Sequence, residues 1–147
     1  MKGDSVINDI IENLLFILPF IHRKILKIEI ERENGNLSRP HLGIMMVLHE
    51  EGTQPISEIG KRLLIPKPQM TGFLDKLESM GMVERFPDSD DRRVINIKLT
   101  EKGQKSLDAM RKVVRENLRE IISGLDAGDL EQLSSSLANV RNIMTKL

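Results

Sequence analysis

The 147-residue chain has no cysteine, no tryptophan and no tyrosine, and its charges cancel to a formal net charge of zero. Without cysteine it can form neither a disulfide framework nor a thiolate metal site, and it has no thiol nucleophile or cysteine redox sensor. Four phenylalanines are its only large aromatic residues, so stacking on single-stranded nucleic acid is not expected. With zero net charge, any binding to nucleic acid must depend on the local arrangement of charge.

The chain also lacks a segment with the features of a secretory signal or a membrane span. Its apolar run, Leu14 to Ile21, follows three acidic residues and is too short to cross a bilayer. No small-residue cleavage site follows that run, and we therefore expect a cytoplasmic protein. The length suits one domain whose core is large enough to fold without a disulfide or a metal.

Helical periodicity covers the N-terminal third of the chain, where apolar residues recur at spacings of three and four from Ile7 to Ile28. Phe16 and Phe20 widen the apolar surface beyond one stripe. Such a helix must be buried on more than one side, which indicates a partner subunit. Pro19 should kink or break this helix, and Asn34-Gly35-Asn36 should end it.

Turn residues divide the rest of the chain into shorter elements. Ser38, Ser57 and Thr100 are placed to cap helices, and Gly52 and Gly81 are placed to end them. Two short segments change to the alternating pattern of strands. The predicted elements are helices at 41–51, 58–64, 68–80, 101–123 and 126–147, and strands at 82–86 and 94–99.

Three short helices followed by a two-stranded hairpin form the order of a winged helix-turn-helix lobe. The helix at 68–80 then corresponds to the recognition helix, whose N-terminal residues can lie in a DNA major groove. Glutamine suits an adenine edge, lysine suits guanine or phosphate, and threonine can contact either. The alternative is a winged-helix protein-interaction module with ordinary polar residues on this surface. The residues of this helix that we predict to bind DNA are Lys67, Gln69, Met70, Thr71 and Lys76.

The hairpin carries a more specific motif. Asp91-x-Arg93, followed after five residues by Leu99-Thr100-x-x-Gly103, resembles the signature of MarR-type transcriptional regulators. The stretch from Leu77 to Arg85 is similar to that family's segment between recognition helix and wing. The resemblance spans nearly the whole chain. It implies a mainly helical single domain with a small β-wing, in which residues 1–36 and 101–147 form dimerisation helices and residues 38–100 form the DNA-binding lobe.

The resemblance also implies roles for the charged residues of the wing. The arginine at the Arg93 position approaches the DNA minor groove, and the aspartate at the Asp91 position holds it in place. A carboxylate two residues away can align a guanidinium before DNA arrives, whereas an exposed ion pair adds at most about 1 kcal/mol of stability. We therefore predict that Arg92 and Arg93 bind DNA and that Asp91 orients Arg93. Turn chemistry suffices for Asp88 and Asp90.

The recognition helix departs from the family at two positions. Pro68 stands where many members have serine, and Gly72 stands where many have arginine or another polar residue. Gly72 gives up a groove contact and costs about 1 kcal/mol of helix propensity relative to alanine. It either allows the helix backbone to approach DNA closely or accommodates packing within the protein.

MarR-type regulators often bind small anionic aromatic molecules, so the resemblance implies an effector. His22 and Arg23 are the polar residues that we predict for that site. The histidines lack the i, i+4 spacing of a helical zinc motif, and no nucleophile–base set or phosphate-binding glycine loop occurs. We expect no metal, no cofactor and no enzymatic activity. The predicted protein is a repressor relieved by that effector, and its other partners are a second copy of the chain and pseudo-palindromic double-stranded DNA.

Overall fold

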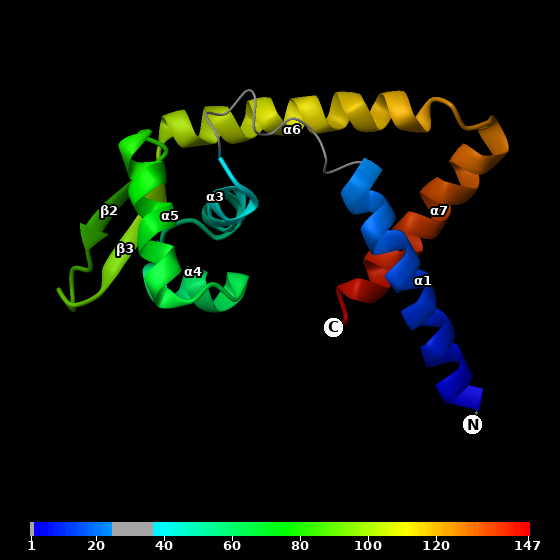
Figure 1. Ribbon diagram of the computed structural model, residues 1–147, viewed down its shortest axis with the longest axis horizontal. Coiled ribbons are helices and arrows are strands. Elements are labelled where there is room, and N and C mark those ends of the chain that lie inside the picture. The colour runs from blue at the N-terminus through cyan, green and yellow to red at the C-terminus, as the bar shows by residue number, and fades with distance from the viewer. Residues whose placement is uncertain (1, 25–36) are drawn as a thin grey trace. The chain divides into compact units, whose positions relative to one another are not determined.

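The computed structural model describes residues 2–24 and 37–147 of the chain (Figure 1). The chain divides into two compact units, one made of Met1–Leu26 with Val113–Leu147 and the other of Lys27–Lys112. The described helices are α1 (Lys2–Lys24), α3 (Arg39–Glu51), α4 (Ile56–Leu63), α5 (Lys67–Ser79), α6 (Glu101–Ile122) and α7 (Ala127–Met144), and the strands are β1 (Gln54–Pro55), β2 (Val83–Pro87) and β3 (Ile95–Leu99).

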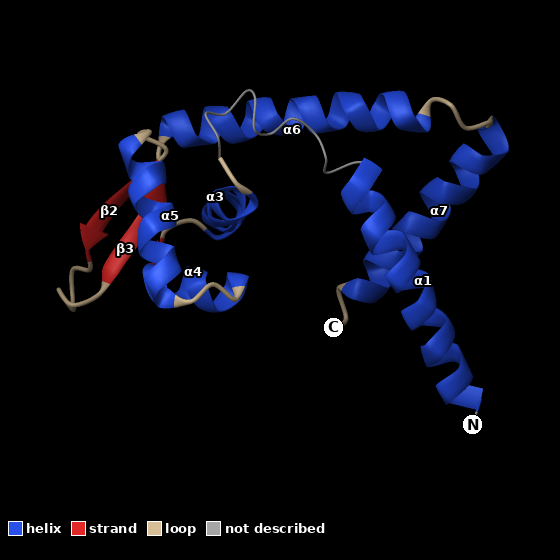
Figure 2. Ribbon diagram, viewed as in Figure 1, coloured by secondary structure: helices blue, strands red, loops and turns tan. Residues whose placement is uncertain are grey.

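The sheet has three antiparallel strands in the order β1-β3-β2. β2 and β3 form the predicted hairpin, with Val83 opposite Leu99 and Pro87 opposite Ile95, and Figure 2 shows the loop at its end. β1 pairs with the other edge of β3. Two residues are too few to show a strand periodicity, so the sequence does not predict β1. The predicted winged helix-turn-helix fold, mainly helical with a small sheet, is confirmed.

The core of the winged lobe takes one face from each helix and the inner face of the hairpin. Residues at helical spacing on α3 and α5 are buried together, and the N-terminal part of α6 adds two more. Burial of these side chains drives the lobe to fold. The most buried members are Leu37, Ile44, Met45, Ile59, Met70, Leu74, Leu77, Val83, Ile97 and Leu107.

Most of the residues predicted to cap or end helices are confirmed, and the helix bounds lie within three residues of those predicted. Gly52 ends α3 with a φ of 76°, and its N–H donates to the Leu48 carbonyl at 3.0 Å. Thr100 caps α6, because its Oγ1 accepts a hydrogen bond from the Gly103 N–H at 3.0 Å. The prediction that Ser57 caps α4 is wrong. Pro55 is the N-cap and α4 starts at Ile56, so Ser57 lies in the first turn.

Helix α1 continues through Pro19 to Lys24, so a break at this proline does not occur. Proline removes one backbone hydrogen bond, and a helix of 23 residues keeps its other ones. The predicted end at Asn34-Gly35-Asn36 lies outside the described residues. Among residues 2–24 and 37–147, no helix combines the length and apolar character needed to cross a bilayer.

The turn between α4 and α5 contains a strained residue. Leu64 ends α4 with a φ of 53°, the only positive φ among the described residues other than glycine. Its side chain is 89% exposed, so little packing offsets the strain. The left-handed conformation costs a residue with a Cβ about 1–2 kcal/mol.

Replacing Leu64 with glycine is expected to raise the free energy of unfolding by about 1 kcal/mol, because glycine adopts positive φ without steric cost. Equilibrium urea unfolding at one fixed protein concentration measures the change. Leu64→Ala keeps the Cβ and serves as the matched control, with stability close to that of the wild type. Equal stabilisation by both variants would mean that the exposed apolar side chain, not the backbone, is the source of the cost.

Candidate nucleic-acid interface

The N-terminal end of α5 presents polar side chains to solvent. The helix begins at Lys67 after the N-cap Pro66, and Pro68 occupies a first-turn position where a missing N–H is tolerated. Lys67, Gln69 and Thr71 are exposed there, and Lys76 is half-buried further along the helix. Three of the predicted residues are therefore accessible to solvent at the start of α5, and their contact with DNA stays a prediction.

Met70 is a correction to the predicted set. Its side chain is fully buried, and Gly60 of α4 packs so closely above it that a Cβ on Gly60 would lie 3.4 Å from Met70 Cγ. Met70 precedes Leu74 by one helical turn and shares its buried face. The helical period places it in the core, where it cannot touch a base.

The loop of the wing is organised by Asp88, which directly follows β2. Its N–H donates to the Val94 carbonyl at 2.9 Å, which closes the loop. Its carboxylate accepts hydrogen bonds from Asn96 Nδ2 at 2.8 Å and from the N–H groups of Asp90 at 3.0 Å and Asp91 at 3.2 Å. These bonds, led by that from Asn96, hold the pKa of Asp88 below its usual value. The carboxylate of Asp88 thus shapes the turn, as its chemistry predicts.

Asp91 and Arg93 form a two-pronged ion pair at the tip of the wing. Arg93 Nε lies 3.0 Å from Asp91 Oδ1, and Arg93 Nη2 lies 3.0 Å from Asp91 Oδ2. The Arg93 N–H also donates to Asp91 Oδ1 at 3.0 Å. The guanidinium lowers the pKa of Asp91, and the carboxylate raises the pKa of Arg93. The predicted pairing is present, and the contact of Arg93 with DNA stays a prediction.

This ion pair fixes the direction of an otherwise free side chain. The Arg93 side chain is 90% exposed and that of Asp91 is 41% exposed, so water screens their attraction and the pair contributes little stability. Two parallel hydrogen bonds nevertheless select one orientation of the guanidinium plane. Arg92 is exposed beside this pair. The tip of the wing therefore presents two cations on a shaped loop.

Arg85 connects the wing to α5, a role that the sequence analysis missed. From β2, its Nη2 donates to Asp75 Oδ1 at 2.6 Å and to the Thr71 carbonyl at 3.3 Å. Its Nε lies 3.1 Å from Glu78 Oε2 but is poorly aligned for a hydrogen bond. The side chain is only 27% exposed. One guanidinium thus contacts two turns of the helix and holds it against the strand.

Comparison with known proteins decides what kind of lobe this is. Residues 37–95 match the model described as the MarR family. This part of the chain is therefore similar to the MarR family. This match begins just before α3 and ends at the start of β3, so it covers the helix-turn-helix and the wing loop.

Solved structures resemble the chain over nearly its whole length. YusO from Bacillus subtilis is 22% identical, with a TM-score of 0.71 and coverage of 97% of this chain and 99% of that one. A MarR family protein from Bacillus stearothermophilus is 19% identical, with a TM-score of 0.74 and 97% of each chain covered. The transcriptional regulator PA4135 is 25% identical, with a TM-score of 0.65 and coverage of 88% and 95%. Together with the family match, these relatives support a DNA-binding regulator, a class that is generally not enzymatic.

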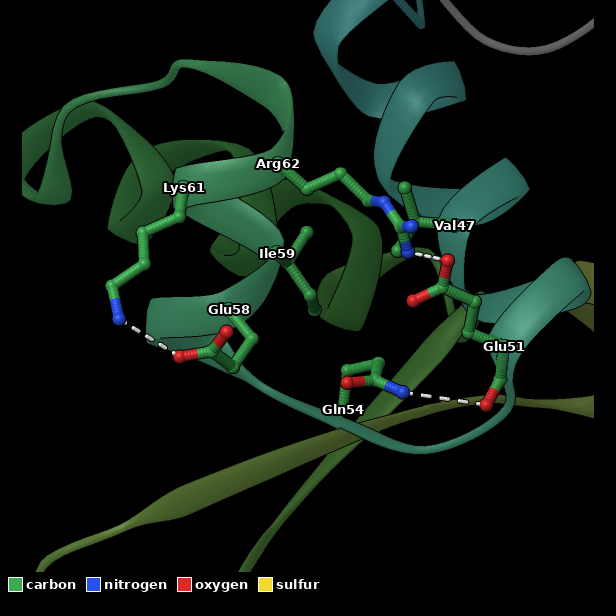
Figure 3. A pocket seen from close by; sticks show the side chains of 7 residues that line it. All are labelled: Val47, Glu51, Gln54, Glu58, Ile59, Lys61 and Arg62. Carbon is green, nitrogen blue, oxygen red and sulfur yellow. Dashed lines mark hydrogen bonds and ion pairs between the residues drawn. The ribbon is translucent and has the colours of Figure 1, made fainter. Parts of the chain in front are cut away.

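The predicted effector residues, His22 and Arg23, follow one another in α1, and their role stays a prediction. Arg23 is exposed at the end of α1, and the side chain of His22 lies outside what the structure describes. Within the lobe, a hollow of about 420 Å³ lies between α3, β1 and α4. Figure 3 shows Arg62 facing Glu51 and Lys61 facing Glu58 around it. Because both cations are paired with carboxylates, this hollow has little attraction for an anionic molecule.

His41 belongs to the core and not to a metal site. It is buried, its Nδ1 accepts a hydrogen bond from the Ser38 N–H at 3.0 Å, and its ring packs edge-on against Phe73 at 5.1 Å. Burial, followed by the nearby charge of Lys76, lowers the pKa of His41 and favours the neutral ring that this bond requires. No group of three or more potential metal ligands occurs in the part of the chain that the structure describes.

Proposed function

We propose that the protein is a homodimeric transcriptional regulator that binds double-stranded DNA in a sequence-specific way and acts as a repressor. The observation that carries the proposal is the Asp91–Arg93 pair, which aims an exposed guanidinium at the end of the hairpin. Neither stability nor packing explains an arginine held in this way. Recognition of a polyanion does, because an arginine aligned in advance loses less side-chain entropy on binding.

The two parts of the lobe suit two grooves of a duplex. Lys67, Gln69 and Thr71 lie at the exposed start of α5, the position from which a recognition helix contacts bases in the major groove. Lys76 would contact phosphate further along the helix. The wing would carry Arg92 and Arg93 to the adjacent minor groove, whose negative potential attracts arginine. Arg85 would keep the wing and α5 in fixed register while both are engaged.

A second copy of the chain is the partner that the other unit requires. The apolar side chains of α1 are exposed in the single chain, among them Ile10 at 53% and Phe16 at 75%. Exposed apolar surface of this extent marks a protein interface. The dimerisation helices would be residues 1–36 and 101–147, flanking the lobe at 38–100 in one domain. Further exposed apolar residues are Leu133, Leu137, Val140, Ile143 and Met144 of α7.

A dimer with two-fold symmetry would bind an operator with matching symmetry, and a change in the dimer's geometry would regulate that binding. Two copies of α5 would enter successive major grooves about 34 Å apart, on a pseudo-palindromic site. A small anionic aromatic effector, contacted by His22 and Arg23, would relieve repression by binding more tightly to a dimer whose helix spacing does not match DNA. Only a difference in affinity between two states can shift their populations.

Selection of bound duplexes from a random pool tests the function. An inverted repeat is the expected outcome, since it reports both DNA binding and dimer symmetry. Titration of the selected duplex at several salt concentrations should show a linear fall of log affinity with log salt, because bound phosphates release counterions. A dimer whose duplex affinity is weak and nearly independent of salt would instead indicate a protein-interaction module.

A further inference from the structure

Gly72 lies on the side of α5 that faces away from the core. At 3.6 residues per turn it is about 200° around the helix from both Met70 and Leu74, which are fully buried. Gly72 itself is exposed, and a Cβ built on it would meet no described atom within 4 Å. Packing within the described protein therefore gives no reason for glycine at this position.

The backbone gives no reason either. Among the described residues, the glycines with positive φ are Gly52 and Gly81, so Gly72 has an ordinary helical conformation that any residue can adopt. A glycine inside a helix lowers the folding equilibrium about fivefold relative to alanine. Gly72 thus carries a cost that nothing in the lobe offsets, and such a cost points to a requirement outside the protein.

The surface around Gly72 suits close contact with a duplex. Its neighbours one turn away are Pro68 and Gln69 on one side and Asp75 and Lys76 on the other. The carboxylate of Asp75 is held by Arg85 at 2.6 Å, which reduces its repulsion of phosphate. Thr71, which precedes Gly72, is exposed but has a short side chain. It can reach a base edge only if the backbone of α5 lies close to the groove floor.

We propose that Gly72 is the point of closest approach between α5 and DNA, and that it sets sequence specificity by letting the helix sit deep in the major groove. A side chain here would lift α5 and draw Gln69 and Thr71 away from the bases. The wing and phosphate contacts would persist. This inference rests on the proposed DNA-binding function and assigns a role to a residue that makes no contact through a side chain.

Gly72→Ala tests the inference, measured against the selected operator and a scrambled duplex. The variant should fold more stably, by about fivefold in the folding equilibrium. It should bind the operator about tenfold more weakly, which corresponds to about 1.4 kcal/mol. Affinity for the scrambled duplex and the salt dependence should stay near wild type, because phosphate contacts are kept. The ratio of the two affinities separates a role in base contact from a purely structural one.

Gly3→Ala is the matched control, since a Cβ on Gly3 of α1 also meets no described atom within 4 Å. Because α1 belongs to the proposed dimerisation helices, the readout for this control is the ratio of the two affinities, which should equal that of the wild type. Gly72→Gln, with a longer side chain, should weaken operator binding further than Gly72→Ala. If Gly72→Ala binds the operator as tightly and as selectively as the wild type, the inference is overturned while the proposed function stands. If the wild type binds no duplex, both are overturned.

Discussion

Replacing Arg93 with alanine is expected to weaken operator affinity about tenfold or more, as the loss of one well-placed arginine contact in each subunit would. The residue is 90% exposed and makes its side-chain bonds to Asp91 alone among the described residues, so the fold should be unaffected. Affinity by fluorescence anisotropy and thermal unfolding measure the two effects separately. Arg92→Ala removes the same charge from the neighbouring position, and a smaller loss is expected because none of the residues that the structure describes holds its guanidinium.

Asp91→Ala distinguishes orientation from simple charge. Removing a carboxylate makes the wing more positive, so Coulomb attraction alone predicts tighter binding to DNA. If Asp91 aligns Arg93, binding should weaken, because the guanidinium must be ordered when the duplex arrives. Asp90→Ala is the matched control. It removes the same charge from the same loop, and its carboxylate makes no hydrogen bond to any described residue, so it should bind as tightly as the wild type or slightly more tightly.

Asp91→Asn refines the test, since it keeps an acceptor for the Arg93 N–H while removing the ionic partner. Its affinity should fall between those of the wild type and Asp91→Ala. Tighter binding by Asp91→Ala would contradict the orienting role. Wild-type affinity in Arg93→Ala would remove the wing from the DNA interface altogether.

The wing could be predicted from the sequence because its contacts are local. Asp88 bonds to backbone groups two and three residues ahead, and Asp91 pairs with the residue two positions on. A side chain can reach only a few groups within two or three residues of itself, so a short motif is enough to predict these contacts. For the same reason the predicted strands at 82–86 and 94–99 lie within one residue of β2 and β3, and the Thr100 cap is confirmed.

Contacts between distant elements were not predictable in this way. Arg85 contacts Asp75 only because β2 packs against α5, and the sequence alone does not show that these two elements pack together. Met70 satisfied two patterns at once, the apolar face of α5 and the N-terminal end of a recognition helix. Its full burial shows that Met70 belongs to the apolar face of α5. Leu64 adopts a left-handed conformation without the glycine that usually signals one.

Gly103 is the last residue of the motif that begins at Asp91, and the packing around it explains why glycine is needed there. It lies in the first turn of α6, is buried, and donates its N–H to Thr100 Oγ1 at 3.0 Å. A Cβ on Gly103 would overlap the Met82 carbonyl oxygen and would lie 2.8 Å from Leu99 Cδ1 and 3.0 Å from the Met82 carbonyl carbon. The same Met82 carbonyl accepts the Thr100 N–H at 3.0 Å. Backbone of the hairpin therefore occupies the space that any side chain would need.

Gly103→Ala is accordingly expected to lower the free energy of unfolding by about 3 kcal/mol, at the upper end of the usual cost of overpacking. Relief would require α6 to move away from β2, because a backbone carbonyl cannot rotate aside as a flexible side chain can. Urea unfolding at fixed concentration measures the loss, and Gly72→Ala provides the comparison, since the same substitution in α5 should stabilise the protein. Opposite signs for the two variants would show that steric space, not helix propensity, decides which helical glycines the lobe needs. A loss below about 1 kcal/mol for Gly103→Ala would mean that α6 is free to shift on the hairpin.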